Sequence, residues 1–155
     1  INKNMQKNYT SIGLMSGTSG DGVDASLINS NGIDQFEVIK DKFFEYDLSI
    51  FKEIHLIKEN IFNLNDLEKL SKRLIKLERE ITIFHAKILN DFEPLNQEDI
   101  LVGFHGQTIY HNSKKRISRQ LGDAKLLHQL SKKKIVFNFR ENDILNNGEG
   151  APLAP

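Results

Sequence analysis

The chain contains no cysteine and no tryptophan, and it has only three prolines among 155 residues. Without cysteine there is no disulfide framework and no thiolate metal site, which is typical of proteins in a reducing compartment. The formal net charge is zero, which argues against nucleic acid or an anionic membrane as the main partner. No apolar run approaches the ~20 residues that span a bilayer, and residues 1–10 lack the apolar stretch of a signal peptide. We therefore expect a cytoplasmic protein that binds neither nucleic acid nor membranes.

Three of the ten glycines lie in one short polar turn, residues 16–22, between predicted strands over 10–16 and 22–29. Such a turn exposes backbone N–H groups and hydroxyl donors, which a phosphate requires. Asp21 and Asp24 add carboxylates that can bind Mg²⁺ through water. The same residues also suit a hairpin turn in which glycine and aspartate only supply unusual backbone angles. The turn is not a P-loop, because no Lys-Ser/Thr pair follows the glycines.

The pattern of apolar residues in the rest of the chain predicts a mixed α/β fold. The expected elements are strands over residues 36–46, 100–104 and 134–139, helices over 47–58 and 124–130, a longer helix from Asn63 or Asn65 to Ile88, a loop at Pro94 and a turn over 140–143. Three early strands followed by alternating helices and strands favour an opening β-meander in a mixed sheet with flanking helices.

Two polar clusters follow predicted strands, where ligands of such sheets bind. Residues 105–108 offer an imidazole, an amide and a hydroxyl beside a glycine, which suits a polyhydroxylated ligand. A loop that satisfies its own hydrogen bonds would show the same pattern. Arg140 and Asp143 suit an acidic substrate group, or equally a local salt bridge or helix cap. The other histidines lack metal-ligand spacing, so the sequence predicts no zinc site.

Five blocks of the sequence occur in the order and spacing of one family's signatures. They are residues 13–24, 103–109, 120–123, 139–144 and 148–155. Together they resemble the anhydro-N-acetylmuramic acid kinase family over nearly the whole chain from Ser11. The resemblance implies an actin-like, hexokinase-like ATPase lobe of the ribonuclease H-like kind. It also implies an enzyme that hydrolyses the 1,6-anhydro ring of anhydro-N-acetylmuramic acid and phosphorylates O6 with ATP, giving N-acetylmuramic acid 6-phosphate in peptidoglycan recycling.

The resemblance also implies site residues and cofactors. Those implied for the ATP phosphates are Gly17, Thr18, Ser19, Gly20, Asp21, Gly22, Val23 and Asp24. Those implied for the sugar are His105, Gly106, Gln107, Thr108 and Arg140, with Arg140 suited to the lactyl carboxylate. ATP and Mg²⁺ are the implied cofactors, and we expect Asp21 to hold the ion through water. The implied partners are the anhydro-sugar and either a second copy of the chain or a separately encoded second half.

The resemblance is to the N-terminal lobe of a two-lobe sugar kinase. We expect that lobe over residues 11–155, preceded by a disordered or non-native segment over 1–10. In the family the base that activates the attacking water lies in a Gly-Phe-Asp-x-Gly-Pro-Gly-Asn block of the second lobe, and this block is absent from the sequence. The resemblance therefore implies that the base lies beyond Pro155, and we expect no catalytic residue in this chain.

The isolated chain is accordingly expected to be inactive. The alternatives are a sugar- or nucleotide-binding lobe that needs a separate second half, or a non-functional gene remnant. Gly20, Asn138 and Glu149 depart from the family pattern.

Overall fold

Six strands form one mixed sheet within residues 7–92 and 100–151, the parts of the chain that the computed structural model describes. The strands are β1 (Tyr9–Ser16), β2 (Gly22–Ser30), β3 (Phe36–Glu45), β4 (Leu101–Asn112), β5 (Ile117–Leu121) and β6 (Lys134–Phe137). The first three form an antiparallel meander, β4 runs parallel to β1, and β6 runs parallel to β4. The later part of β4 pairs instead with β5, in antiparallel orientation. The order β3-β2-β1-β4 places the turn after β1 beside the middle of β4.

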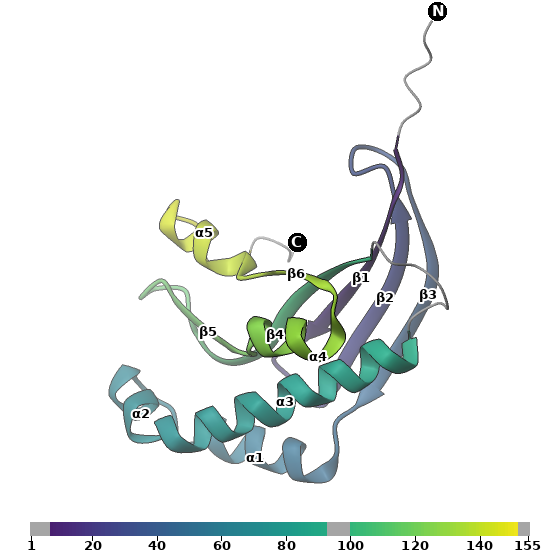
Figure 1. Cartoon of the computed structure of the whole chain (residues 1–155). Coiled ribbons are helices and arrows are strands. Elements are labelled where there is room, and N and C mark those ends of the chain that lie inside the picture. Colours follow the sequence, from purple (N-terminus) through teal and green to yellow (C-terminus); the bar gives the residue numbers. More distant parts are fainter. Residues whose placement is uncertain (1–6, 93–99, 152–155) are drawn as a thin grey trace, which may run out of the picture.

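Helices cover one face of this sheet (Figure 1). They are α1 (Leu48–Lys58), α2 (Leu64–Lys69), α3 (Ser71–Phe92), α4 (Ala124–Ser131) and α5 (Phe139–Leu145), of which α1, α3 and α4 lie on that face. Alternate residues of the strands, such as Leu14 and Phe104, are buried in one core with Ile54 and Ile81 of the helices. Each such side chain contributes roughly 1.5–3 kcal/mol when it is removed from water. No helix in the described residues is both long and apolar enough to cross a membrane.

The structure confirms most of the expected elements. The opening meander, the strand that follows it and the helices α1 and α4 lie where the sequence predicts them. Strand β1 begins at Tyr9, so Tyr9 and Thr10, which were expected in a disordered or non-native segment, belong to the sheet. The strand expected over 134–139 ends at Phe137. Residues 1–6, the predicted loop at Pro94 and the last residues up to Pro155 lie outside the described residues.

The prediction of one long helix from Asn63 to Ile88 is wrong, because two helices occupy this stretch. Asn63 caps α2, its side-chain oxygen accepting a hydrogen bond from the Asn65 N–H at 2.9 Å, and Asp66 completes the capping box. The helix ends at Leu70, whose backbone (φ −89°, ψ 4°) leaves the helical region before α3 begins. The apolar spacing continues across Leu70, so the sequence pattern does not reveal the break.

Two segments expected outside the helices and strands are regular elements. Residues 105–111 continue β4, because the hairpin partner β5 supplies hydrogen bonds beyond the end of β1. Gly106 permits this with φ +76°, and a Cβ at Gly106 would lie 2.5 Å from the Leu121 carbonyl oxygen. Residues 140–143 form part of α5. That helix starts after Asn138, which has φ 64°, a conformation that asparagine tolerates better than most residues.

Replacement of Gly106 by alanine will test the tight contact between β4 and β5. Gly106→Ala adds left-handed strain and a contact with the Leu121 carbonyl, so we expect it to lower the free energy of unfolding by roughly 2–4 kcal/mol. The matched control is Gly32→Ala, since Gly32 has φ +73° but no atom within 4 Å of the position that a Cβ would take. We expect the control to cost about 1 kcal/mol. Equal losses in urea titrations of the two variants would contradict the close-contact explanation.

Candidate functional site

The turn between β1 and β2 is held in place by donors from three other parts of the fold. All three donate to backbone oxygens of the turn. The bonds run from the Tyr46 N–H to Asp21 O at 2.9 Å, from Gln107 Nε2 to Gly17 O at 2.7 Å, and from Lys58 Nζ to Thr18 O. Tyr46 follows β3, Lys58 ends α1 and Gln107 lies in β4. We name residues 16–22 the phosphate loop, after the role that the sequence predicts for them.

This arrangement sets the direction of the N–H groups in the phosphate loop. In a planar trans peptide the C=O of one residue and the N–H of the next point in opposite directions. Because the carbonyls of Gly17 and Thr18 point toward protein donors, the N–H groups of Thr18 and Ser19 point away from them. The side chains of Thr18 and Ser19 are exposed. Successive N–H groups with nearby hydroxyls form a favourable concavity for a phosphate.

Asp21 lies at the exposed end of the phosphate loop. Its Oδ1 accepts a hydrogen bond from Ser19 Oγ at 2.6 Å, and this bond is the main reason that the pKa of Asp21 lies below its usual value. Asp21 is therefore ionised at neutral pH. In the described parts of the chain no three acidic or histidine side chains gather into a metal site. One carboxylate fits Mg²⁺ when phosphate oxygens and water complete the coordination.

Gly20 allows the phosphate loop to lie directly on α1. It has φ +71°, and a Cβ there would lie 2.8 Å from Ile54 Cγ2. Val23 is fully buried in the core, and Asp24 is exposed on β2 opposite Met15. The eight residues predicted to bind phosphate therefore divide into a compact loop, one core residue and one strand residue.

A buried chain of three side chains supports the start of the phosphate loop. Tyr46 Oη donates to Ser16 Oγ at 3.0 Å, and Ser16 Oγ lies 3.3 Å from His85 Nε2. His85 Nδ1 lies 2.8 Å from the Ile81 carbonyl, which can only accept. Nδ1 therefore carries the proton, and Nε2 accepts from the Ser16 hydroxyl. The three residues come from the segment after β3, the end of β1 and the middle of α3.

Burial keeps the three linked side chains uncharged. His85 is fully buried, and burial lowers its pKa to about 4, with a smaller effect from the nearby His105. Burial also raises the pKa of Tyr46. The edge of His85 meets the Phe104 ring at a centroid distance of 5.0 Å, and Tyr46 contacts the Phe84 ring at the same distance. Buried, neutral side chains thus join the loop to the core.

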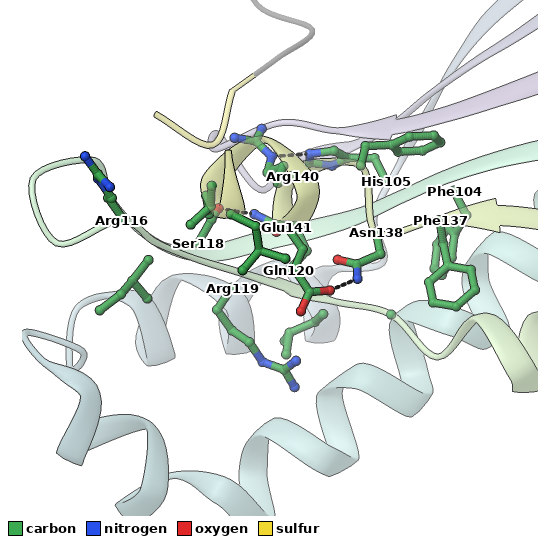
Figure 2. A pocket seen from close by; sticks show the side chains of 16 residues that line it. Phe104, His105, Arg116, Ser118, Arg119, Gln120, Phe137, Asn138, Arg140 and Glu141 are labelled. Carbon is green, nitrogen blue, oxygen red and sulfur yellow. Dashed lines mark hydrogen bonds between the residues drawn. The ribbon is translucent and has the colours of Figure 1, made fainter. Parts of the chain in front are cut away.

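The predicted sugar residues His105 and Arg140 meet at the edge of a cavity of about 570 Å³ (Figure 2). Arg140 Nε donates to His105 Nε2 at 2.8 Å, so His105 accepts there and is protonated at Nδ1, which lies 2.6 Å from Gly106 O. Burial is the main cause that lowers the pKa of His105, and it also lowers the pKa of Arg140. His105 is therefore a neutral partner that orients a cationic guanidinium.

Arg140 and Asp143 do not form the pair that the sequence suggested. Both bind the tail instead, Arg140 Nη1 donating to Gly150 O and Asp143 Oδ2 accepting from Gly150 N, each at 2.8 Å. Gly150 is buried with φ +80°, which agrees with a close-packed turn at the start of this tail. The two bonds described for Arg140 use two of the five N–H donors of a guanidinium.

The remaining predicted sugar residues lie apart from this cavity. Gln107 is fully buried and reaches the phosphate loop, while its Oε1 has no hydrogen-bond partner in the described part of the chain. Thr108 is buried and accepts a hydrogen bond from Gln120 Nε2 at 3.2 Å. Gly106 has its backbone against Leu121. The structure thus joins Gln107 to Gly17 and His105 to Arg140, but it does not bring all five residues together.

Sequence reasoning missed the residues that support the phosphate loop, namely Tyr46, Lys58 and His85. One signal for His85 was present. It stands four residues after Ile81 on the apolar stripe of α3, where a polar side chain needs a buried partner. Tyr46 and Lys58 carry no comparable signal, because their contacts join segments far apart in the sequence.

Comparison with known proteins identifies the family. The sequence model described as "Anhydro-N-acetylmuramic acid kinase" matches residues 9–155. The chain belongs to this family. A relative of that name from Pelagibacter ubique (strain HTCC1062) is 53% identical over 152 residues, which cover 97% of this chain. Relatives of the same name from Gluconobacter oxydans and Rhizobium etli are 37% and 34% identical, over 93% and 94% of this chain.

This family member spans about 40% of the length of these curated relatives. All five signature blocks fall within the matched region, residues 9–155. The resemblance inferred from the sequence is therefore confirmed at the level of the family. The relatives contain further chain, and the matched part, which runs to Pro155, corresponds to an N-terminal lobe. That the catalytic base lies beyond Pro155 stays a prediction.

The buried His85 predicts a loss of stability in mild acid. The unfolded chain takes up a proton on His85 near pH 6.5, whereas the folded chain does so only near pH 4. Acidification between these values therefore favours unfolding, and His85 accounts for a loss of roughly 3 kcal/mol across that window. Urea titrations at several pH values will measure it, and the difference between the wild type and His85→Asn isolates it from the carboxylates. An equal slope in the wild type and in His85→Asn would contradict the assignment.

Proposed function

We propose that this chain is the lobe of an anhydro-N-acetylmuramic acid kinase that binds the ATP phosphates and part of the sugar. The enzyme hydrolyses the 1,6-anhydro ring and phosphorylates O6 with ATP, giving N-acetylmuramic acid 6-phosphate for peptidoglycan recycling. The observation that carries the proposal is the hydrogen bond from Gln107 Nε2 to Gly17 O at 2.7 Å. It joins the predicted sugar block to the predicted phosphate loop across 90 positions of sequence.

In this proposal the phosphate loop binds the ATP phosphates through the N–H groups of Thr18 and Ser19 and through the Thr18 hydroxyl, since the Ser19 hydroxyl donates to Asp21. Asp21 holds Mg²⁺ through water, and the ion supplies charge stabilisation for the transferred phosphoryl group when it is bound. Phosphoryl transfer depends mainly on positioning and on such charge stabilisation. The three donors behind the loop support this role, because they hold the N–H groups in place before the nucleotide arrives.

The sugar binds, in the same proposal, between Arg140 and Gln107. Arg140 retains N–H donors beyond its bonds to His105 and Gly150, which suits the lactyl carboxylate. Gln107 Oε1 is a buried acceptor without a partner in the described residues, which suits a hydroxyl group. His105, Gly106 and Thr108 position these two side chains through β4.

The base that activates water is assigned to another part of the enzyme. Glu141 is the one carboxylate among the described residues that line the cavity, and it accepts a hydrogen bond from Asn138. The sequence block that holds the family's base is absent from this chain, so we place the base in the second lobe, outside the segment that ends at Pro155.

The strand order supports an actin-like, ribonuclease H-like lobe, since an antiparallel meander leads into strands parallel to β1. In such enzymes ATP lies between two lobes. The natural partner of this lobe is then a second lobe like the additional chain of the relatives, and the assembled enzyme is a cytoplasmic dimer. The alternative is a binding lobe that acts only with a separately supplied second half, which the 40% coverage of the relatives also supports.

A chimaeric enzyme tests the proposal. Residues 9–155 replace the matching segment of the Pelagibacter ubique relative, and phosphorylation of anhydro-N-acetylmuramic acid by ATP is measured. We expect the chimaera to be active because the two sequences are 53% identical over this region.

Arg140→Met should raise the KM for the sugar by about 10- to 100-fold, the effect of losing a charged hydrogen bond. Asp21→Asn should lower activity at limiting Mg²⁺.

The matched control for Arg140→Met is Arg79→Met, which replaces a surface arginine on α3. It should leave both kinetic constants unchanged. A folded chimaera without kinase activity would contradict the proposed function. An active chimaera in which Arg140→Met behaves like Arg79→Met would contradict the proposed role of Arg140 alone.

A further inference from the structure

Tyr46 contacts the phosphate loop at both ends. Its hydroxyl donates to Ser16 Oγ at 3.0 Å, where β1 enters the loop. Its backbone N–H donates to Asp21 O at 2.9 Å, where the loop leaves toward β2. A single residue, placed by the end of β3, therefore fixes the distance between the two ends of the loop.

The donor and the acceptor of each hydrogen bond that links Tyr46, Ser16 and His85 can be assigned. His85 Nδ1 donates to Ile81 O, so the ring offers one acceptor, Nε2, to Ser16. The Ser16 hydroxyl has one hydrogen, which it donates in the hydrogen bond to His85 Nε2. Tyr46 must then be the donor to Ser16. If any of the three side chains lost its role, a buried donor or acceptor would be left without its partner, which is costly in a dry environment.

The rings are held independently of these hydrogen bonds. Tyr46 contacts Phe84, and His85 meets the edge of Phe104. Ser16 and His85 are both fully buried, and Tyr46 is 5% exposed. Removal of the Tyr46 hydroxyl therefore leaves the ring in place and releases only Ser16, the residue that precedes Gly17. The hydroxyl has a role that is separable from packing.

We propose that Tyr46 is a positioning residue for phosphate binding, acting through Ser16 with His85 as the final acceptor of the chain. The inference rests on the proposed function, because it assumes that the loop binds the phosphates of ATP. Tyr46 itself does not touch the nucleotide. It keeps the loop in the one conformation in which the N–H groups of Thr18 and Ser19 point away from the protein donors.

The test uses the ¹⁵N-labelled 155-residue chain with Tyr46→Phe, Ser16→Ala and the double variant. Amide resonances of residues 17–19 are recorded first without ligand and then during a titration with Mg-ATP. We expect both single variants to shift or broaden the loop amides and to weaken Mg-ATP binding about fivefold, the effect of one net hydrogen bond. The double variant should be no weaker than Ser16→Ala, because Ser16→Ala already removes the bond between Tyr46 Oη and Ser16 Oγ. Ser16→Ala also serves if Tyr46→Phe does not fold.

Tyr110→Phe is the matched control, since Tyr110 is a partly buried tyrosine on β4 that packs against the same core. It should change neither the loop amides nor the affinity. If the wild type binds Mg-ATP and Tyr46→Phe binds it equally well, the inference is overturned while the proposed function stands. If the wild type does not bind Mg-ATP, phosphate binding by this chain fails. The inference then falls with it, because a residue cannot position a loop for a ligand that the loop does not bind.

Discussion

The parallel pairing of β1 with β4 is the constraint on which the candidate site depends. It places Ser16 beside Gln107, after a register irregularity that follows Leu14. Because β1 stops there while β4 continues, the Gln107 side chain can donate to the Gly17 carbonyl in the phosphate loop. Gly106 supplies the backbone conformation that allows β4 to continue along β5. A shift of one residue in this register would move Gln107 to the other face of the strand.

Hydrogen-bond donors from the rest of the lobe determine the conformation of the phosphate loop. Carbonyl oxygens of the loop are drawn to Gln107, Lys58 and Tyr46, and the peptide geometry then directs neighbouring N–H groups the other way. These donors come from a strand, a helix and a connecting segment, so the loop conformation depends on the packing of the whole lobe. This explains why a glycine-rich turn, which is flexible on its own, can serve as a preorganised site.

The sequence predicted elements better than contacts. Alternation and helical spacing identified β1, β2, β3, α1 and α4, because each buries one face in the same core. The break at Leu70 does not interrupt that spacing, so the sequence did not reveal it. Strand β5 was missed because it is stabilised by its pairing with β4, which a local sequence pattern does not encode. The family blocks located Gly17 and Gln107, yet nothing in either block indicated that one would donate to the other. Their spacing in the sequence suggested that Asp143 pairs with Arg140, but in the structure both side chains form hydrogen bonds with the Gly150 backbone.

The two parts of the candidate site differ in how complete they are. The phosphate loop has its supporting donors within the described residues, and its environment is dry and neutral around Ser16 and His85. The cavity beside Arg140 shares no lining residue with the loop, and Gln107 between them has an acceptor without a partner among the described residues. A ligand that spans both would satisfy that acceptor and would connect the guanidinium to the loop. Gln107 therefore connects the two parts of the proposed site, because its amide nitrogen donates to Gly17 O and its amide oxygen is the acceptor proposed for the sugar.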